Sequence, residues 1–285
     1  MNKIFDLHND FLTSINRDNK KTQYLLNKKQ KTISNIISSV WTTKMSRENA
    51  VKSIRKGFSF IESINRSKCA CKPQLGLAIE DMHFVSKECL DEVIAYNPIY
   101  CGLTWNYDNV LAGGAHDGGD ISMFGIEVIR ELESNNIFVD TAHLSEKSFM
   151  TFSCLTEKPI LCSHTAVHSL VNNNRNLKDY QIRMIAESGG LIGIALVGQF
   201  LSNDKKSTIS DIARHIDYIV SLYGDKNIAL GTDFYGTKNL PKGIKNYSNL
   251  KLLEDRLKIL GYSEETINNI FYKNAENFFN KNTTI

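Results

Sequence analysis

The sequence of 285 residues has few features that would connect it with nucleic acid or with a membrane. Its 34 basic and 31 acidic residues are scattered along the chain, so the net charge is +3 and no run of one sign is longer than short lysine patches such as Lys28 to Lys31. A nucleic-acid partner is therefore not implied. No apolar run has the length of a membrane span and no signal peptide precedes the first polar motif, so we expect no membrane association.

The cysteines also lack the spacing of common metal-binding or redox motifs. None of the six forms a C-x-x-C pair, and the nearest neighbours are Cys69 and Cys71 in "CAC". That pair could hold a metal ion or form a redox couple, but its spacing does not favour either. Since no secretory signal is recognised, we expect a reduced, cytoplasmic setting.

Short apolar runs recur along the chain, and eight of them have the length of buried parallel strands. They cover residues 3–7, 36–42, 75–80, 99–105, 137–142, 159–164, 190–197 and 228–233. The segments between them have helical periodicity, as in residues 46–64. Helix signals flank them: Ser145 stands at an N-cap position, and Gly189, Gly190 and Gly224 stand where helices would end.

Eight strands alternating with helices predict an α/β fold, a single (β/α)8 TIM barrel over residues 1–285, because a closed parallel barrel buries such strands under amphipathic helices. No linker or internal repeat indicates a second domain. The alternative is an open doubly wound sheet, but no G-x-G-x-x-G motif follows the first apolar run.

Acidic and imidazole side chains follow the ends of five of these runs. In a barrel of this type the active site is built at the C-terminal ends of the strands, so these side chains should converge on one rim. They are His8, Asp10, Glu80, His143, His164 and Asp233. Each alone is more often a cap or a structural residue, but together they supply nitrogen and oxygen ligands that suit zinc or a similar divalent ion. Six groups exceed one tetrahedral site, which favours two metal ions sharing a carboxylate.

The other four histidines are not assigned to the metal. His83 and His168 lie just past two strand ends and could contact the metal ligands without binding the metal themselves. His116 lies in a glycine-rich loop, and His215 lies within a predicted helix, where packing or surface exposure is expected.

The ordered set of motifs resembles the membrane (renal) dipeptidase family, bacterial type, whose members are zinc metallopeptidases on an amidohydrolase-like barrel. The resemblance covers nearly the whole chain and includes "DLHND", "LTWNYDNVLAGG", "FVDTAHLSEKSF", "KPILCSHTAVHSL", "NNNRNLKDYQ" and "IALGTDFYG". It implies two Zn²⁺ ions bridged by Glu80 and by a water or hydroxide. By this resemblance, one ion is held by His8 and Asp10, and the other by His143 and His164.

The resemblance also implies how substrate is bound. Arg175 in "NRNL" matches the arginine that holds the C-terminal carboxylate of a dipeptide, although a salt bridge within its loop is the structural alternative. Asp233 matches an acidic residue near the substrate amine and the scissile bond, which would transfer protons. Two positions depart from the pattern, because Trp105 replaces a histidine of the animal members and Tyr235 replaces a carboxylate, which affects the expected substrate preference.

The expected activity is therefore hydrolysis of the peptide bond of dipeptides, with a small dipeptide as partner and with a homodimer allowed by the resemblance. A different metal-dependent amidohydrolase reaction, such as that of a deacylase, lactonase or phosphotriesterase, is an alternative on the same barrel. A barrel that only binds ligands is a further alternative, since fold does not fix function. The complete set of expected ligands favours the dipeptidase.

Overall fold

The computed structural model describes residues 2–15, 32–66 and 73–282. Eight parallel strands form a closed barrel in which each strand pairs with the next and β8 pairs with β1. The strands are β1 (Ile4–Asn9), β2 (Ile33–Trp41), β3 (Gln74–Glu80), β4 (Tyr100–Gly102), β5 (Phe138–Asp140), β6 (Leu161–Thr165), β7 (Leu191–Ile194) and β8 (Ile228–Leu230). Each strand overlaps one of the predicted apolar runs, which confirms the (β/α)8 barrel.

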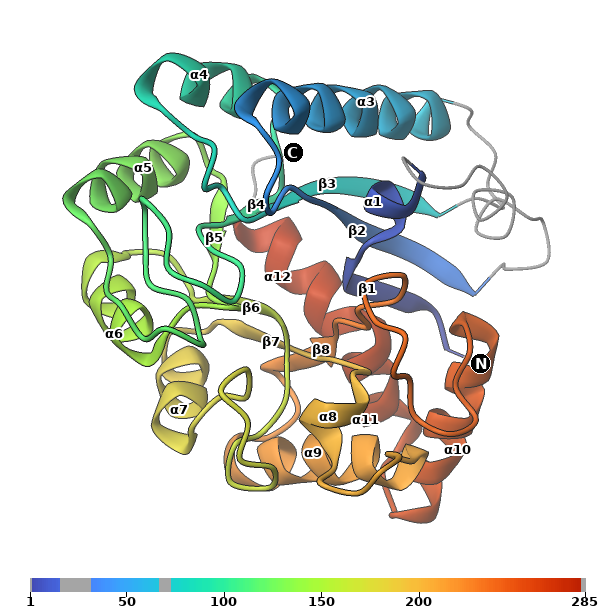
Figure 1. The fold of residues 1–285 in the computed structure, drawn as a ribbon. Helices are drawn as coiled ribbons and strands as arrows, with labels where there is room; N and C mark the ends of the chain where they lie inside the picture. The colour runs from blue at the N-terminus through green and yellow to red at the C-terminus, as the bar shows by residue number, and fades with distance from the viewer. Residues whose placement is uncertain (1, 16–31, 67–72, 283–285) are drawn as a thin grey trace.

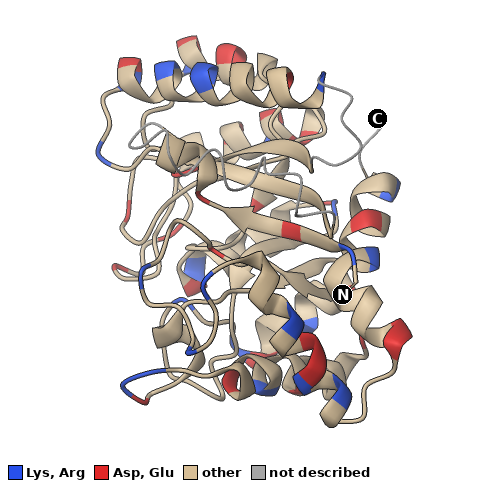
Figure 2. Cartoon of the chain, turned by 90° about the vertical axis from the view of Figure 1, so that its right-hand side faces the viewer, with Lys and Arg blue, Asp and Glu red and all other residues tan. Residues whose placement is uncertain are grey.

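Helices surround the barrel, as Figure 1 shows. They are α1 (Phe11–Ile15), α3 (Arg47–Asn65), α4 (Lys87–Ala95), α5 (Met123–Ser134), α6 (Glu146–Leu155), α7 (Asp179–Glu187), α8 (Gly198–Leu201), α9 (Ile209–Tyr223), α10 (Leu250–Ile259), α11 (Glu264–Asn268) and α12 (Asn274–Asn282), with a short 3-10 turn η1 (Tyr247–Asn249) and a π-helical turn η2 (Asn269–Lys273). Most of the larger helices bury one face against the strands. Figure 2 shows basic and acidic residues mixed along these outer elements.

The N-cap predicted at Ser145 and the helix end predicted at Gly224 are confirmed, and Ser46 is an N-cap that was not predicted. The Ser145 hydroxyl accepts a hydrogen bond from the backbone of Ser148 at the start of α6, and Ser46 accepts one from the backbone of Asn49 at the start of α3. Gly224 ends α9 with a φ of 76°, a conformation that glycine adopts without the steric cost of a side chain.

The N-terminal end of the barrel is closed by α12. Phe278 and Phe279 of this helix pack against Phe5 of β1 and Phe138 of β5, with ring centroids 5.6 Å apart for Phe5 and Phe279 and 5.1 Å apart for Phe138 and Phe278. These apolar side chains fill the N-terminal end of the barrel, and polar side chains lie at the opposite, C-terminal rim of the strands.

Two further expectations concern cysteines and membranes. Cys69 and Cys71 lie outside the described residues, and the cysteines within the described ranges are free thiols. In the described part of the chain, no helix is both long enough and apolar enough to cross a membrane.

Candidate metal centre

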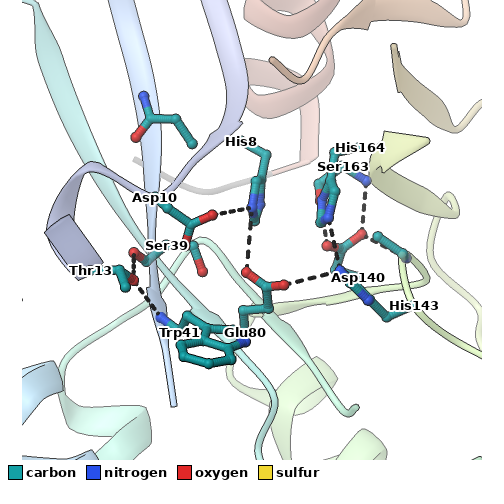
Figure 3. A network of polar contacts seen from close by, with 12 residues as sticks. His8, Asp10, Thr13, Ser39, Trp41, Glu80, Asp140, His143, Ser163 and His164 are labelled. Carbon is teal, nitrogen blue, oxygen red and sulfur yellow. Dashed lines mark hydrogen bonds and ion pairs between the residues drawn. The ribbon is translucent and has the colours of Figure 1, made fainter. Parts of the chain in front are cut away.

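The five predicted metal ligands converge at the C-terminal rim of the barrel (Figure 3). His8 and Asp10 come from the end of β1, Glu80 is the last residue of β3, His143 follows β5, and His164 lies on β6. All five are at most 6% exposed. The structure therefore brings together, from four strands, the side chains that the sequence spacing predicted to meet.

Glu80 lies between the histidines of the two sides. Its Oε1 is 3.0 Å from His143 Nε2, and its Oε2 is 3.5 Å from His8 Nε2. His143 Nε2 is also 3.0 Å from His164 Nε2, and Asp10 Oδ2 is 3.8 Å from His8 Nε2. One carboxylate thus faces both sides of the cluster.

The backbone is strained where two of these loops leave the barrel. His143 and Asp233 have φ values of 69° and 55°, in the left-handed region that side chains of L-residues adopt at a cost. The backbone nitrogen of Asp233 donates to the carbonyl of His8 over 3.0 Å, so the loop after β8 is fixed to β1. This places the Asp233 carboxyl beside Asp10.

Each of the three histidines has an oxygen atom as the partner of its Nδ1. The partners are the Tyr100 hydroxyl for His8, Asn106 Oδ1 for His143 and Ser163 Oγ for His164, each at 2.8 Å. Tyr100 also donates to the carbonyl of Leu7, so its oxygen accepts from His8. With Nδ1 as the donor, the lone pair of Nε2 points into the cluster, as metal binding requires.

Several buried atoms of the cluster have no hydrogen-bond partner within the described ranges. They include His8 Nε2, Asp10 Oδ1 and Glu80 Oε2. Lone pairs and carboxylate oxygens that face one another without a proton between them are costly unless a cation lies there. The residues therefore fit a metal site of nitrogen and oxygen ligands.

Within the described part of the chain, potential ligand atoms form three groups in which all atoms lie within 4.8 Å of one another. Two correspond to the two halves of the expected centre, since Glu80, His143 and His164 form one and His8 and Asp10 form another with Asp233. The third joins His8 and His164 with Asp140, a carboxylate at the end of β5 that the sequence interpretation did not single out.

Burial and neighbouring charges shift the pKa values of this metal-free cluster in both directions. Burial lowers the pKa of His8, but Tyr100, Asp10 and Glu80 together raise it well above its ordinary value, and burial with the Glu80 charge raises the pKa of Asp10. Burial would raise the pKa of Glu80, but its contacts with His143 and His8 hold it well below the ordinary range. Burial and the Arg175 charge lower the pKa of His143 to about 3, so this imidazole is neutral at neutral pH. Burial and the carboxylate of Asp10 raise the pKa of Asp233 well above its ordinary value.

A cavity of about 430 Å³ opens over the cluster. Trp41 and Trp105 line one part of it, their rings 5.7 Å apart, and Arg175, Phe200 and Tyr235 line others. This volume is within the range of small-molecule sites. Both positions that depart from the family pattern, Trp105 and Tyr235, therefore face the cavity.

Arg175 is buried in the loop after β6, where its Nη2 lies 3.1 Å from His164 Nε2. Among residues 2–15, 32–66 and 73–282, no carboxylate lies within 4.0 Å of its guanidinium, so the alternative of a loop salt bridge finds no partner there. Its Nε also has no hydrogen-bond partner in these ranges. A buried guanidinium with unused N–H donors at the wall of a cavity is suited to binding an anion.

The other histidines have separate positions. His215 is fully buried in α9, where its Nδ1 accepts from the backbone of Val167 and its Nε2 donates to the carbonyl of Leu201, which confirms a packing role. His83 contacts Asp81 and the carbonyl of Met45, and His168 lines a different hollow. His116 is exposed and lines the cavity, which its loop position did not predict.

Sequence interpretation missed Tyr100, Asn106, Ser163 and Asp140. Tyr100 and Asp140 are polar residues on short strands that are otherwise apolar, and Ser163 directly precedes His164. A polar residue in a buried strand is the signal that could have identified them.

The chain is similar in sequence to known proteins. The chain is 29% identical over 185 residues to an uncharacterised protein encoded in the pqqA 5′ region of Klebsiella pneumoniae, covering 61% of this chain and 68% of that protein. It is 30% identical over 188 residues to an uncharacterised dipeptidase of Schizosaccharomyces pombe, covering 62% of this chain and 45% of that protein. The chain thus spans less than half of the yeast protein.

A solved structure shares the fold. It is a metallopeptidase of Rhodobacter sphaeroides bound to a phosphinate mimic of the dipeptide L-Ala-D-Ala, with a TM-score of 0.88 at 18% identity and coverage of 99% of both chains. The sequence model of the membrane dipeptidase family matches residues 45–283. Because this match extends over most of the chain, the protein belongs to the membrane dipeptidase family, peptidase family M19, and so to the metallopeptidases.

Proposed function

We propose that the protein hydrolyses the peptide bond of dipeptides and that it uses two zinc ions. His8 and Asp10 would hold one ion, His143 and His164 the other, and Glu80 would be shared. The observation that supports this most directly is the position of Glu80, whose two oxygens face His143 on one side and His8 on the other at 3.0 and 3.5 Å. Bound zinc would lower the pKa of a water molecule and polarise the scissile carbonyl.

Asp233 would transfer the proton in this reaction. Its carboxyl lies beside Asp10, and burial with that neighbouring charge raises its pKa well above the ordinary range. A general base is most effective when its pKa is close to the working pH, so a raised value suits a carboxyl that takes a proton from water and passes it to the leaving amine.

Arg175 would bind the C-terminal carboxylate of the substrate. The cavity of about 430 Å³ has room for a dipeptide, and the guanidinium on its wall lacks a carboxylate partner in the described ranges. The Rhodobacter protein with a dipeptide mimic supports the same substrate class. Binding of the carboxylate by Arg175 would select dipeptides, because a third residue would move the carboxylate away from this side chain.

The test compares free dipeptides with dipeptide amides, which lack the carboxylate. In wild-type enzyme we expect kcat/KM to be much higher for the acid. In Arg175→Met, kcat/KM for the acid should fall by the equivalent of about 2–5 kcal/mol in transition-state free energy, the range for truncating one partner of a buried charge pair. The kcat/KM values of this variant for the acid and the amide should be nearly equal. Arg183→Met, on the exposed face of α7, is the matched control and should behave as wild type.

Equal hydrolysis of acids and amides by the wild-type enzyme would remove Arg175 from carboxylate binding. The choice between dipeptides and the substrates of other metal-dependent amidohydrolases would then be open again. A single domain over residues 1–285, a cytoplasmic location and a homodimer stay predictions.

A further inference from the structure

We propose that Asp140 is a positioning residue that determines which ring nitrogen of His164 carries the proton, and that it acts through the hydroxyl of Ser163. The consequence for zinc rests on the proposed function, in which Nε2 of His164 is a ligand. The position of the proton itself can be measured in zinc-free protein, so the two proposals can fail separately.

The contacts of Asp140 are all with hydrogen-bond donors. It is 3% exposed at the end of β5. Its Oδ1 accepts from the backbone nitrogens of Ser163 at 2.8 Å and Ala142 at 3.1 Å, and its Oδ2 accepts from the Ser163 hydroxyl. Figure 3 shows Asp140, Ser163 and His164 side by side. In the described ranges no lysine or arginine lies within 4.0 Å of this carboxylate, so its hydrogen-bond partners are neutral groups, and ring nitrogens of His8 and His164 lie within 4.8 Å of it.

The single hydroxyl proton of Ser163 determines which ring nitrogen of His164 is protonated. Ser163 has a single hydroxyl proton, which it donates to Asp140. Its oxygen, 2.8 Å from His164 Nδ1, can therefore only accept, so Nδ1 carries the ring proton. On the other side of the ring, Arg175 Nη2 lies 3.1 Å from Nε2, and a guanidinium can only donate. The contact of Ser163 with Asp140 thus fixes the lone pair on Nε2, the nitrogen that faces Glu80 and His143, and the Arg175 donor favours the same form.

Replacing Asp140 with asparagine should weaken this arrangement. The two backbone N–H groups at Oδ1 keep the amide oxygen of the new side chain in that place, so its NH₂ group faces Ser163 Oγ. Ser163 would then accept from the amide and donate its own proton to His164 Nδ1. The ring proton would then be drawn toward Nε2, against the donor contact of Arg175 Nη2. The lone pair needed for metal binding would therefore be lost in part of the molecules.

The first measurement is ¹⁵N NMR of histidine side chains in zinc-free protein, with the His164 signals identified by their loss in His164→Gln. Wild type should show only the Nδ1–H form of His164, and Asp140→Asn should show a measurable fraction of the Nε2–H form. Thr141→Val is the matched control, because Thr141 is the buried neighbour of Asp140 and its hydroxyl contacts the carbonyl of Leu161. This variant should keep the wild-type signals.

Variants of Ser163 provide a test that does not depend on the folding of Asp140→Asn. Ser163→Thr keeps the hydroxyl and should keep the Nδ1–H form, whereas Ser163→Ala should give a mixture of both forms. If His164 keeps its proton on Nδ1 in both Asp140→Asn and Ser163→Ala, the proposal is wrong.

Zinc binding is the second measurement, made by competition with a chelator. Asp140→Asn should weaken one zinc site by about 10- to 100-fold, the range for residues that orient a metal ligand. In the Ser163→Ala background, the same Asp140→Asn change should alter zinc affinity by less than about 2-fold, because the hydroxyl that links Asp140 to His164 is already absent. Fully additive losses would show that Asp140 acts by its charge and would overturn the proposal. The expected tautomers in a protein without dipeptidase activity would support this inference and contradict the proposed function.

Discussion

At the scale of single residues, the carboxyl groups of Asp10 and Asp233 have the most unusual surroundings. A Cβ atom on Gly236 would overlap Asp10 Oδ2 and Asp233 Oδ1, so both oxygens lie beside the same backbone. Burial and the carboxylate of Asp10 raise the pKa of Asp233 well above 3.8. In the absence of zinc, two neighbouring carboxylates repel each other and lower the stability of the folded protein.

The first prediction concerns the pH dependence of this cost in zinc-free protein. A carboxyl with a raised pKa in the folded state stabilises the fold most below its unfolded pKa, near pH 4, and this contribution is lost as the pH rises through the folded pKa. Asp233→Asn cannot ionise, so its melting temperature should exceed that of wild type increasingly between pH 4 and pH 7. The exposed Asp91→Asn is the control. A constant difference across this range would contradict the raised pKa.

At the scale of elements, two glycines let the strands around His164 approach closely. A Cβ atom on Gly193 of β7 or on Gly231 after β8 would overlap the backbone carbonyl of Ser163 on β6. The carbonyl belongs to the residue before His164, so the position of this predicted ligand depends on the absence of side chains at Gly193 and Gly231.

The second prediction is that Gly193→Ala shifts β6 and lowers both stability and zinc affinity. The cost should be about 1–3 kcal/mol of unfolding free energy, the range for overpacking a core. Denaturant unfolding and zinc competition measure the two effects. Wild-type zinc affinity in a destabilised variant would show that β6 does not transmit the shift to His164.

The elements were largely predictable from sequence because each strand overlaps a distinct apolar run. The predicted metal ligands converge because each stands at or just after the end of such a run. Strand lengths were less predictable: β4, β5 and β8 have three residues each, while the apolar runs around them are longer. The partners of the histidines were not found, because they depend on contacts between distant residues. Tyr100 and His8 are 92 positions apart in sequence, and no local pattern connects them.

At the scale of the whole molecule, the barrel separates a polar end from an apolar end. The metal cluster lies at the C-terminal ends of the strands, and α12 closes the N-terminal end with Phe278 and Phe279. In such barrels the first end carries the chemistry and the second contributes to stability.

The third prediction follows from this separation. Phe279→Ala removes a ring that packs 5.6 Å from Phe5 and 6.0 Å from Phe138. It should lower the unfolding free energy by about 3–5 kcal/mol, as expected for large-to-small changes in a core. The folded variant should bind the same number of zinc ions as wild type. A changed zinc content in folded protein would mean that the two ends of the barrel are coupled.

The most direct test of the central claim is the number of zinc ions bound per chain in zinc-reconstituted protein. Wild type should bind close to two equivalents. His143→Ala should lose one and keep the other, because the ion on the His8 side retains His8, Asp10 and Glu80 as ligands. One tightly bound ion in wild type, with no second ion taken up on titration with zinc, would contradict the shared centre.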